Sequence, residues 1–184
     1  EAKPGFYIRL ENKWKQGDVV ELTLPMHLAF QLWTENKNSG SVKDGPLTFS
    51  LKIKEYYQKV DSKESAIGDS KWQPNADQSK WPAYNIYPES MWNYGLELNG
   101  KPLSEQFEII KKPWPESNFP FDQKDVPVMI KAKGKLIPEW TIDQYGLCDV
   151  LPQSPVDVHT SEQNIELIPM GAARLRISAF PVVK

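Results

Sequence analysis

The chain has 184 residues, of which 40% are apolar and 25% charged, and its formal net charge is −2. These values are ordinary for a globular domain, and the mixed charges exclude the basic footprint of a nucleic-acid-binding protein. No apolar run approaches the ~20 residues that span a bilayer, so we expect neither a nucleic-acid nor a membrane partner. The 16 prolines argue against long helices, because each proline removes a backbone donor.

The first third of the chain predicts a series of short strands. Residues 6–10 alternate between apolar and polar, and a turn at 14–18 leads to a second alternating segment at 19–26. Further alternating segments follow at 27–33 and 45–53. A period of two places alternate side chains on one face of a sheet, so one face of residues 45–53 should lie in the core. The residues expected on that face are Leu47, Phe49, Leu51 and Ile53.

The middle of the chain, at about 54–120, reads as a long insertion rich in loops and aromatic residues. It is polar at first and contains two short strand candidates, residues 92–98 and 107–110. A loop region of this length in a compact domain is usually functional, interfacial or disordered. We therefore expect residues 1–184 to form a single domain with a long loop-rich insertion at about 54–120.

The last third again predicts strands, at residues 126–132, 165–168 and 174–180. Many short alternating segments separated by turn signals are typical of an all-β fold. We predict an antiparallel β-sandwich, similar to a jelly roll, with long aromatic-rich loops.

The sequence offers little for catalysis. Two histidines, His27 and His159, lie far apart, and no nucleophile motif or phosphate-binding loop occurs. The single cysteine, Cys148, cannot form a thiolate zinc site alone, and its apolar neighbours suggest a buried side chain. The carboxylates are spread along the chain, and most are expected to be solvated surface charges. We therefore predict no catalytic residue, no metal site and no cofactor.

Aromatic residues are the remaining candidates for a binding role. Exposed aromatic rings stack on sugars, which makes a carbohydrate site one interpretation. The other, which we favour, is a structural role in which the rings cap an open sandwich or bury against a partner domain, since tryptophan and tyrosine are enriched at interfaces. The candidates for either role are Trp72, Trp81, Trp92, Tyr94 and Trp114.

Several segments of the chain resemble a known family in sequence and in order. They are WKQGD (14–18) followed by VVELTLPM (19–26), GPL (45–47), LIPMG (167–171) and LRISAFP (175–181). The chain resembles the C-terminal β-sandwich region of glycoside hydrolase family 127-like proteins, which include β-L-arabinofuranosidases. Residues 81–87 and 92–96 fit the same region in a bacterial branch of that family.

The resemblance implies a non-catalytic C-terminal accessory domain cut from a larger glycosidase. In that family an upstream α/α barrel carries the catalytic glutamate and a cysteine-rich zinc site, and none of those residues has a counterpart here. The domain would pack on the upstream catalytic barrel of the same polypeptide and shape the rim of its active site. The alternative is an autonomous carbohydrate-binding module, and a free-standing enzyme is a third, weaker reading. The family also implies a periplasmic or extracellular location, which the sequence itself leaves unknown.

Overall fold

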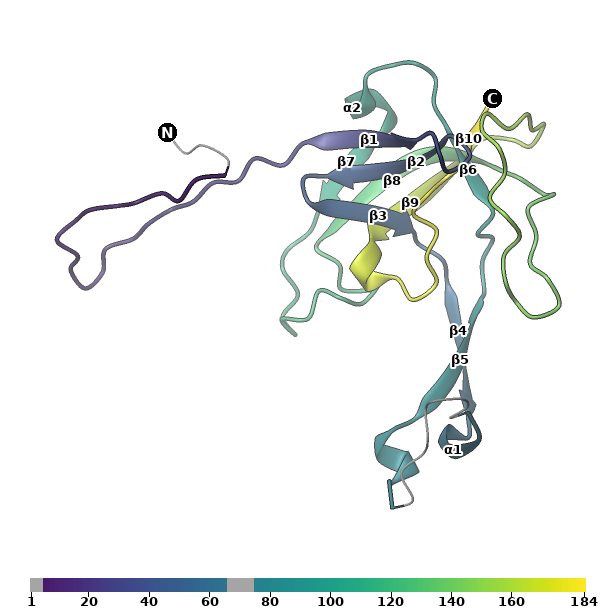
Figure 1. Cartoon of the computed structure of the whole chain (residues 1–184), viewed down its shortest axis with the longest axis horizontal. Coiled ribbons are helices and arrows are strands. Elements are labelled where there is room, and N and C mark those ends of the chain that lie inside the picture. The colour runs from purple at the N-terminus through teal and green to yellow at the C-terminus, as the bar shows by residue number, and fades with distance from the viewer. Residues whose placement is uncertain (1–4, 66–74) are drawn as a thin grey trace.

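The computed structural model describes residues 5–65 and 75–184, and its regular structure is almost entirely β (Figure 1). The four described helical segments are each a single turn: α1 (Ser62–Ser65), η1 (Gln78–Lys80), α2 (Leu103–Gln106) and η2 (Met170–Ala172). None of these helices is long and apolar enough to cross a bilayer. The predicted all-β class is confirmed.

Eight of the described strands form one sheet. Its order is β1 (Leu28–Trp33), β2 (Ser39–Asp44), β3 (Leu47–Leu51), β9 (Gln163–Pro169), β8 (Val128–Leu136), β6 (Tyr94–Glu97) and β10 (Val182–Val183), and β7 (Glu108–Lys111) also pairs with β8. Every pairing in it is antiparallel except that of β10 with β6. The predicted sandwich is not confirmed, because these strands belong to a single sheet and not to two facing ones.

The C-terminal segment links distant parts of this sheet. Gly40 and Phe180 exchange two backbone hydrogen bonds of 2.8 Å, and the amide of Leu51 donates to the carbonyl of Ile177 at 2.8 Å. Most of residues 174–180 therefore do not form the continuous strand that was predicted. The segment makes isolated contacts with several strands, and this irregular pairing replaces a regular ladder.

The core lies where the clearest sequence pattern predicted it. Phe49 is fully buried, and Leu51 and Ile53 are 2% exposed, while Leu47 is partly buried at the start of β3. Ser50 is also fully buried, because the C-terminal segment covers the other face of the strand. Its hydroxyl donates to the carbonyl of Ile177 at 3.1 Å, so this buried polar group is satisfied.

The N-terminal part of the chain departs from the prediction. Residues 6–10 and 19–26 were expected to be strands, but residues 5–27 contain no strand and extend away from the sheet (Figure 1). Nearly every residue of this N-terminal arm is exposed. A strand needs a neighbouring strand for its backbone hydrogen bonds, and the described residues provide none here.

The expected insertion contains more regular structure than its sequence indicated. Two strands, β4 (Glu55–Val60) and β5 (Ala83–Pro88), pair over six residues and form a separate two-stranded sheet. This β4–β5 hairpin projects from the body, with α1 near its far end (Figure 1). The carboxylate of Asp61 accepts from the first amides of α1, and the Ser62 hydroxyl donates to the carbonyl of Trp81 at 2.7 Å.

Candidate functional site

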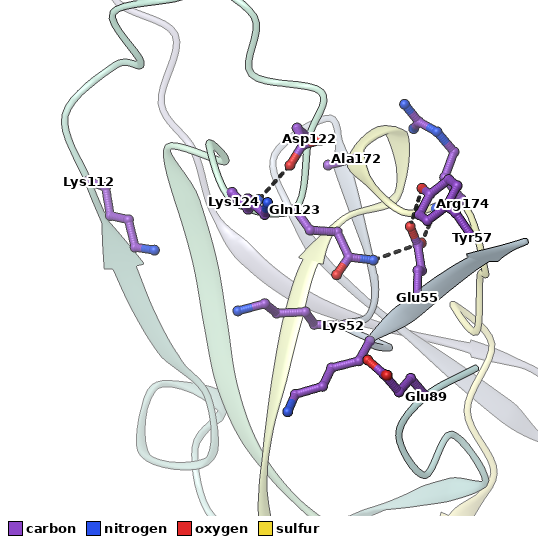
Figure 2. Close-up of a pocket in the computed structure, with 11 residues that line it drawn as sticks. Lys52, Glu55, Tyr57, Glu89, Lys112, Asp122, Gln123, Lys124, Ala172 and Arg174 are labelled. Carbon is purple, nitrogen blue, oxygen red and sulfur yellow. Dashed lines mark hydrogen bonds between the residues drawn. The ribbon is translucent and has the colours of Figure 1, made fainter. Parts of the chain in front are cut away.

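A polar hollow lies where the β4–β5 hairpin leaves the body (Figure 2). Its volume is about 480 Å³, within the range of small-molecule sites. Five segments that are distant in sequence supply its walls. The lining residues are Lys52, Lys54, Glu55, Tyr57, Glu89, Lys112, Asp122, Gln123, Lys124, Ala172 and Arg174.

Glu55 is the organising residue of this pocket. Its Oε1 accepts hydrogen bonds from Gln123 Nε2 at 2.8 Å, from the Arg174 amide at 2.9 Å and from the Leu175 amide at 3.2 Å. Its Oε2 accepts from the hydroxyl of Tyr57 at 2.6 Å. One carboxylate thus joins the first residue of the hairpin to two other segments of the body, which fixes the direction in which the hairpin leaves.

Tyr57 is held in its neutral form by this carboxylate. The hydrogen bond to Glu55, aided by partial burial, raises the pKa of Tyr57 to about 12 from 10.0. A neutral phenol donates a hydrogen bond and presents an apolar ring face. Tyr57 therefore forms a wall of the pocket and does not act as a base at ordinary pH.

The other walls carry mixed charge. Lys52 pairs with Glu166 at 2.8 Å, whereas Lys54, Lys112 and Lys124 have no ion pair within the described part of the chain. Figure 2 shows Lys52 and Lys112, which directly follow β3 and β7, on different sides of the hollow. Ammonium groups, carboxylates and an aromatic ring thus line the same hollow. In residues 5–65 and 75–184, no cluster of His, Cys, Asp or Glu has the arrangement of a metal site.

The aromatic residues predicted as site candidates do not converge on one place. Trp72 lies outside the described residues. Trp81 is 68% exposed at the far end of the hairpin. Trp114 is 60% exposed, and its Nε1 donates to Asn118 at 2.7 Å. It lines an apolar groove of about 420 Å³, beside Phe121.

The remaining two candidates have structural roles. The ring of Trp92 packs edge-on against Trp140, with centroids 5.0 Å apart, in a small core cluster. Tyr94 lies on β6 and donates to Gln163 at 2.8 Å, and burial raises the pKa of its hydroxyl. Cys148, which was expected to be buried, is exposed instead.

Sequence reasoning missed the residues that form the polar pocket. Glu55, Gln123 and Arg174 meet only through tertiary structure, so spacing along the chain gives no sign of them. The segment EYYQKV of β4 lacks the clear apolar alternation of residues 45–53, because polar and aromatic residues occur on both faces of this two-stranded hairpin. Comparisons with protein-family models, curated proteins and solved structures find no match for the chain.

Proposed function

We propose that this chain is a non-catalytic accessory domain that docks on a larger catalytic partner through its β4–β5 hairpin. The single observation that carries the proposal is the aromatic surface of the hairpin. Five large aromatic side chains on it are between 44% and 68% exposed: Tyr56, Tyr57, Trp81, Tyr84 and Tyr87.

The strand register distributes these rings over both faces of the hairpin. Tyr56 lies opposite Tyr87 on one face. Tyr57 and Tyr84 lie on the other, with their rings in an edge-to-face arrangement and centroids 6.0 Å apart. Isolated two-stranded hairpins are marginally stable in water, and aromatic side chains with a polar end are enriched at interfaces. A partner surface that covers both faces would stabilise the hairpin.

The resemblance to family 127-like proteins supplies the identity of the partner in this proposal. The hairpin would contact the helical barrel that precedes the β domain in such glycosidases, near the rim of its active site. The polar pocket lies at the base of the same hairpin, so docking there would place Tyr57 and Gln123 beside the partner.

The proposal is tested by adding the catalytic barrel of a family 127 glycosidase to this chain and following tryptophan fluorescence. A saturable change that is lost in Trp81→Phe and kept in Trp114→Phe would support docking through the hairpin. Hydrolysis of aryl arabinosides by the purified chain alone, or no response to the barrel in the intact chain, would overturn the proposal.

A second candidate function is carbohydrate binding at the polar pocket. The volume of about 480 Å³ and the mixture of donors, acceptors and an aromatic wall favour it. Titration with arabinose-containing oligosaccharides tests this function. A saturable response that Gln123→Ala removes, together with no response to the barrel, would favour a binding module over a docking domain.

A further inference from the structure

The second limb of the N-terminal arm, residues 19–26, has the properties of a strand without a partner. Val20 is 56% exposed, Leu22 67% and Leu24 71%. The turn before it is closed by two contacts between Lys15 and Asp18, of 3.1 and 2.9 Å. Among the described residues, the backbone of 19–26 has no hydrogen-bond partner. This combination of apolar alternation and free backbone groups is typical of a segment that adds to a sheet edge.

Residues 19–26 lead directly into β1, which lies at an edge of the sheet. Strand β1 is the last strand on one side of the sheet (Figure 1). The His27 carbonyl accepts from Gly45 at 3.1 Å, so the odd-numbered residues of this strand direct their backbone groups toward β2. The even-numbered residues Leu28, Phe30 and Leu32 therefore direct theirs outward, toward a place where a further strand can pair.

We propose that two copies of the chain associate about a two-fold axis at Met26, each laying its residues 19–26 along the β1 edge of the other. The pairing is antiparallel. Leu24 then lies opposite Leu28 of the partner subunit, and Leu22 opposite Phe30 of the partner subunit. Val20 lies opposite Leu32 of the partner subunit. This proposal is independent of the proposed function, because it uses the arm and not the hairpin.

This register sorts the side chains by polarity. Val20, Leu22 and Leu24 extend the face on which Leu28 and Phe30 already pack against the core. The opposite face receives Glu21 and Thr23, and Val19 lies at its end, opposite Trp33 of the partner subunit. Residues directly opposite in an antiparallel pair share a face, so a slip of one residue would place the apolar side chains in water.

Two further details agree with this register. Pro25 lacks an amide, and its odd number places it where no outward hydrogen bond is required. Glu21 comes opposite Gln31 of the partner subunit. In each copy Gln31 already accepts from the Lys43 ammonium at 3.2 Å, so the carboxylate meets a surface with a positive charge.

In this dimer, residues 19–26 of each copy pair with the outer edge of β1 of the other. Both elements that lack a partner in the single chain are therefore paired. A two-fold contact is closed, so the exchange ends at a dimer and does not continue into a fibre. It also removes an exposed sheet edge, which otherwise invites uncontrolled association.

Sedimentation equilibrium of the intact chain tests the association. We expect a dimer at about 100 µM, and a dissociation constant at least ~10-fold higher in Leu22→Glu. Thr23→Glu is the matched control, since it adds the same charge on the polar face, opposite Ala29 of the partner subunit and beside the partner's Lys43, and should not raise the constant. A monomer at every concentration up to about 100 µM, or equal weakening by both variants, would overturn the proposal.

Cysteine cross-linking tests the register in the Cys148→Ser background. Met26→Cys places two thiols at the axis and should give a covalent dimer on oxidation. Leu24→Cys is the control, because its two copies lie four residues apart, or ~14 Å along the strands at ~3.4 Å per residue. More cross-linking of Leu24→Cys than of Met26→Cys would show a different register and overturn this arrangement.

Discussion

The body of the sheet and the segments that project from it bury their apolar side chains to very different degrees. In the body, Phe49, Ile130 and Leu167 are fully buried on adjacent strands. In the N-terminal arm and the β4–β5 hairpin, equally large side chains such as Leu24 and Trp81 are about 70% exposed. Both kinds of segment have sequences that favour β-structure, so composition alone does not explain the difference.

The difference lies in the number of neighbours that each strand has. Strand β8 pairs with β9 on one side and with β6 and β7 on the other, and its side chains fill the core. Within residues 5–65 and 75–184, the hairpin has one strand pairing and the arm has none. A side chain is buried only where a second element covers it, so the same alternation gives a core in the body and an exposed surface in the projections.

The largest expected effect is in the body. Phe49→Ala should lower the free energy of unfolding by ~3–5 kcal/mol, because it removes a fully buried ring and leaves a cavity. Urea denaturation measures this loss. The matched control is Phe119→Ala, in the loop between β7 and β8 where the ring is 52% exposed, and a similar loss there would show that burial does not set the cost.

A smaller loss is expected from Gly40→Ala. A Cβ at this position would lie 1.7 Å from the ring of Phe30 on the neighbouring strand. The ring must move, and such overpacking costs ~1–3 kcal/mol. Gly171→Ala is the control, since the nearest atom to its Cβ would be 3.7 Å away, and equal midpoints for all three proteins would contradict the close packing at Gly40.

The junction between the two regions is tested by a pKa. The hydrogen bond from Tyr57 to Glu55 raises the pKa of Tyr57 to about 12 from 10.0. The contact therefore stabilises the fold fully below pH 10 and loses this effect as the pH rises through about 12. Glu55→Gln should return the pKa of Tyr57 toward 10.0, as measured by NMR of ¹³C-labelled tyrosine. An unchanged pKa would show that the junction is not held by this contact.

The smallest effect is expected at the end of the hairpin. Trp81→Ala should change the free energy of unfolding by no more than ~0.5 kcal/mol, because its side chain is 68% exposed. Thermal denaturation of the isolated chain measures it. A loss above about 2 kcal/mol would mean that the ring is buried and would remove Trp81 from the docking surface.

The sequence predicted the body well because local alternation and tertiary burial agree there. The residues Phe49, Leu51 and Ile53 were expected inside, and all three are buried. The same alternation failed at residues 19–26, because a period of two predicts a strand and says nothing about whether a neighbour is present. At residues 174–180 it failed because contacts with several strands replace one regular pairing.

The candidate site was less predictable from the sequence. Aromatic composition identified Trp81 and Trp114, which are exposed, but it also selected Trp92 and Tyr94, which have packing roles. The pocket at Glu55 depends on hydrogen bonds to Gln123 and Arg174, which are 68 and 119 residues away. Such contacts leave no periodic signal, so no pattern of one segment can predict them.

Docking through the hairpin is tested by hydrogen exchange of the chain with and without a family 127 catalytic barrel. We expect amides of β4 and β5 to exchange more slowly in the complex, whereas those of β8 and β9 keep the rates of the isolated chain. Protection confined to the body, or unchanged exchange in the hairpin at saturating barrel, would contradict it.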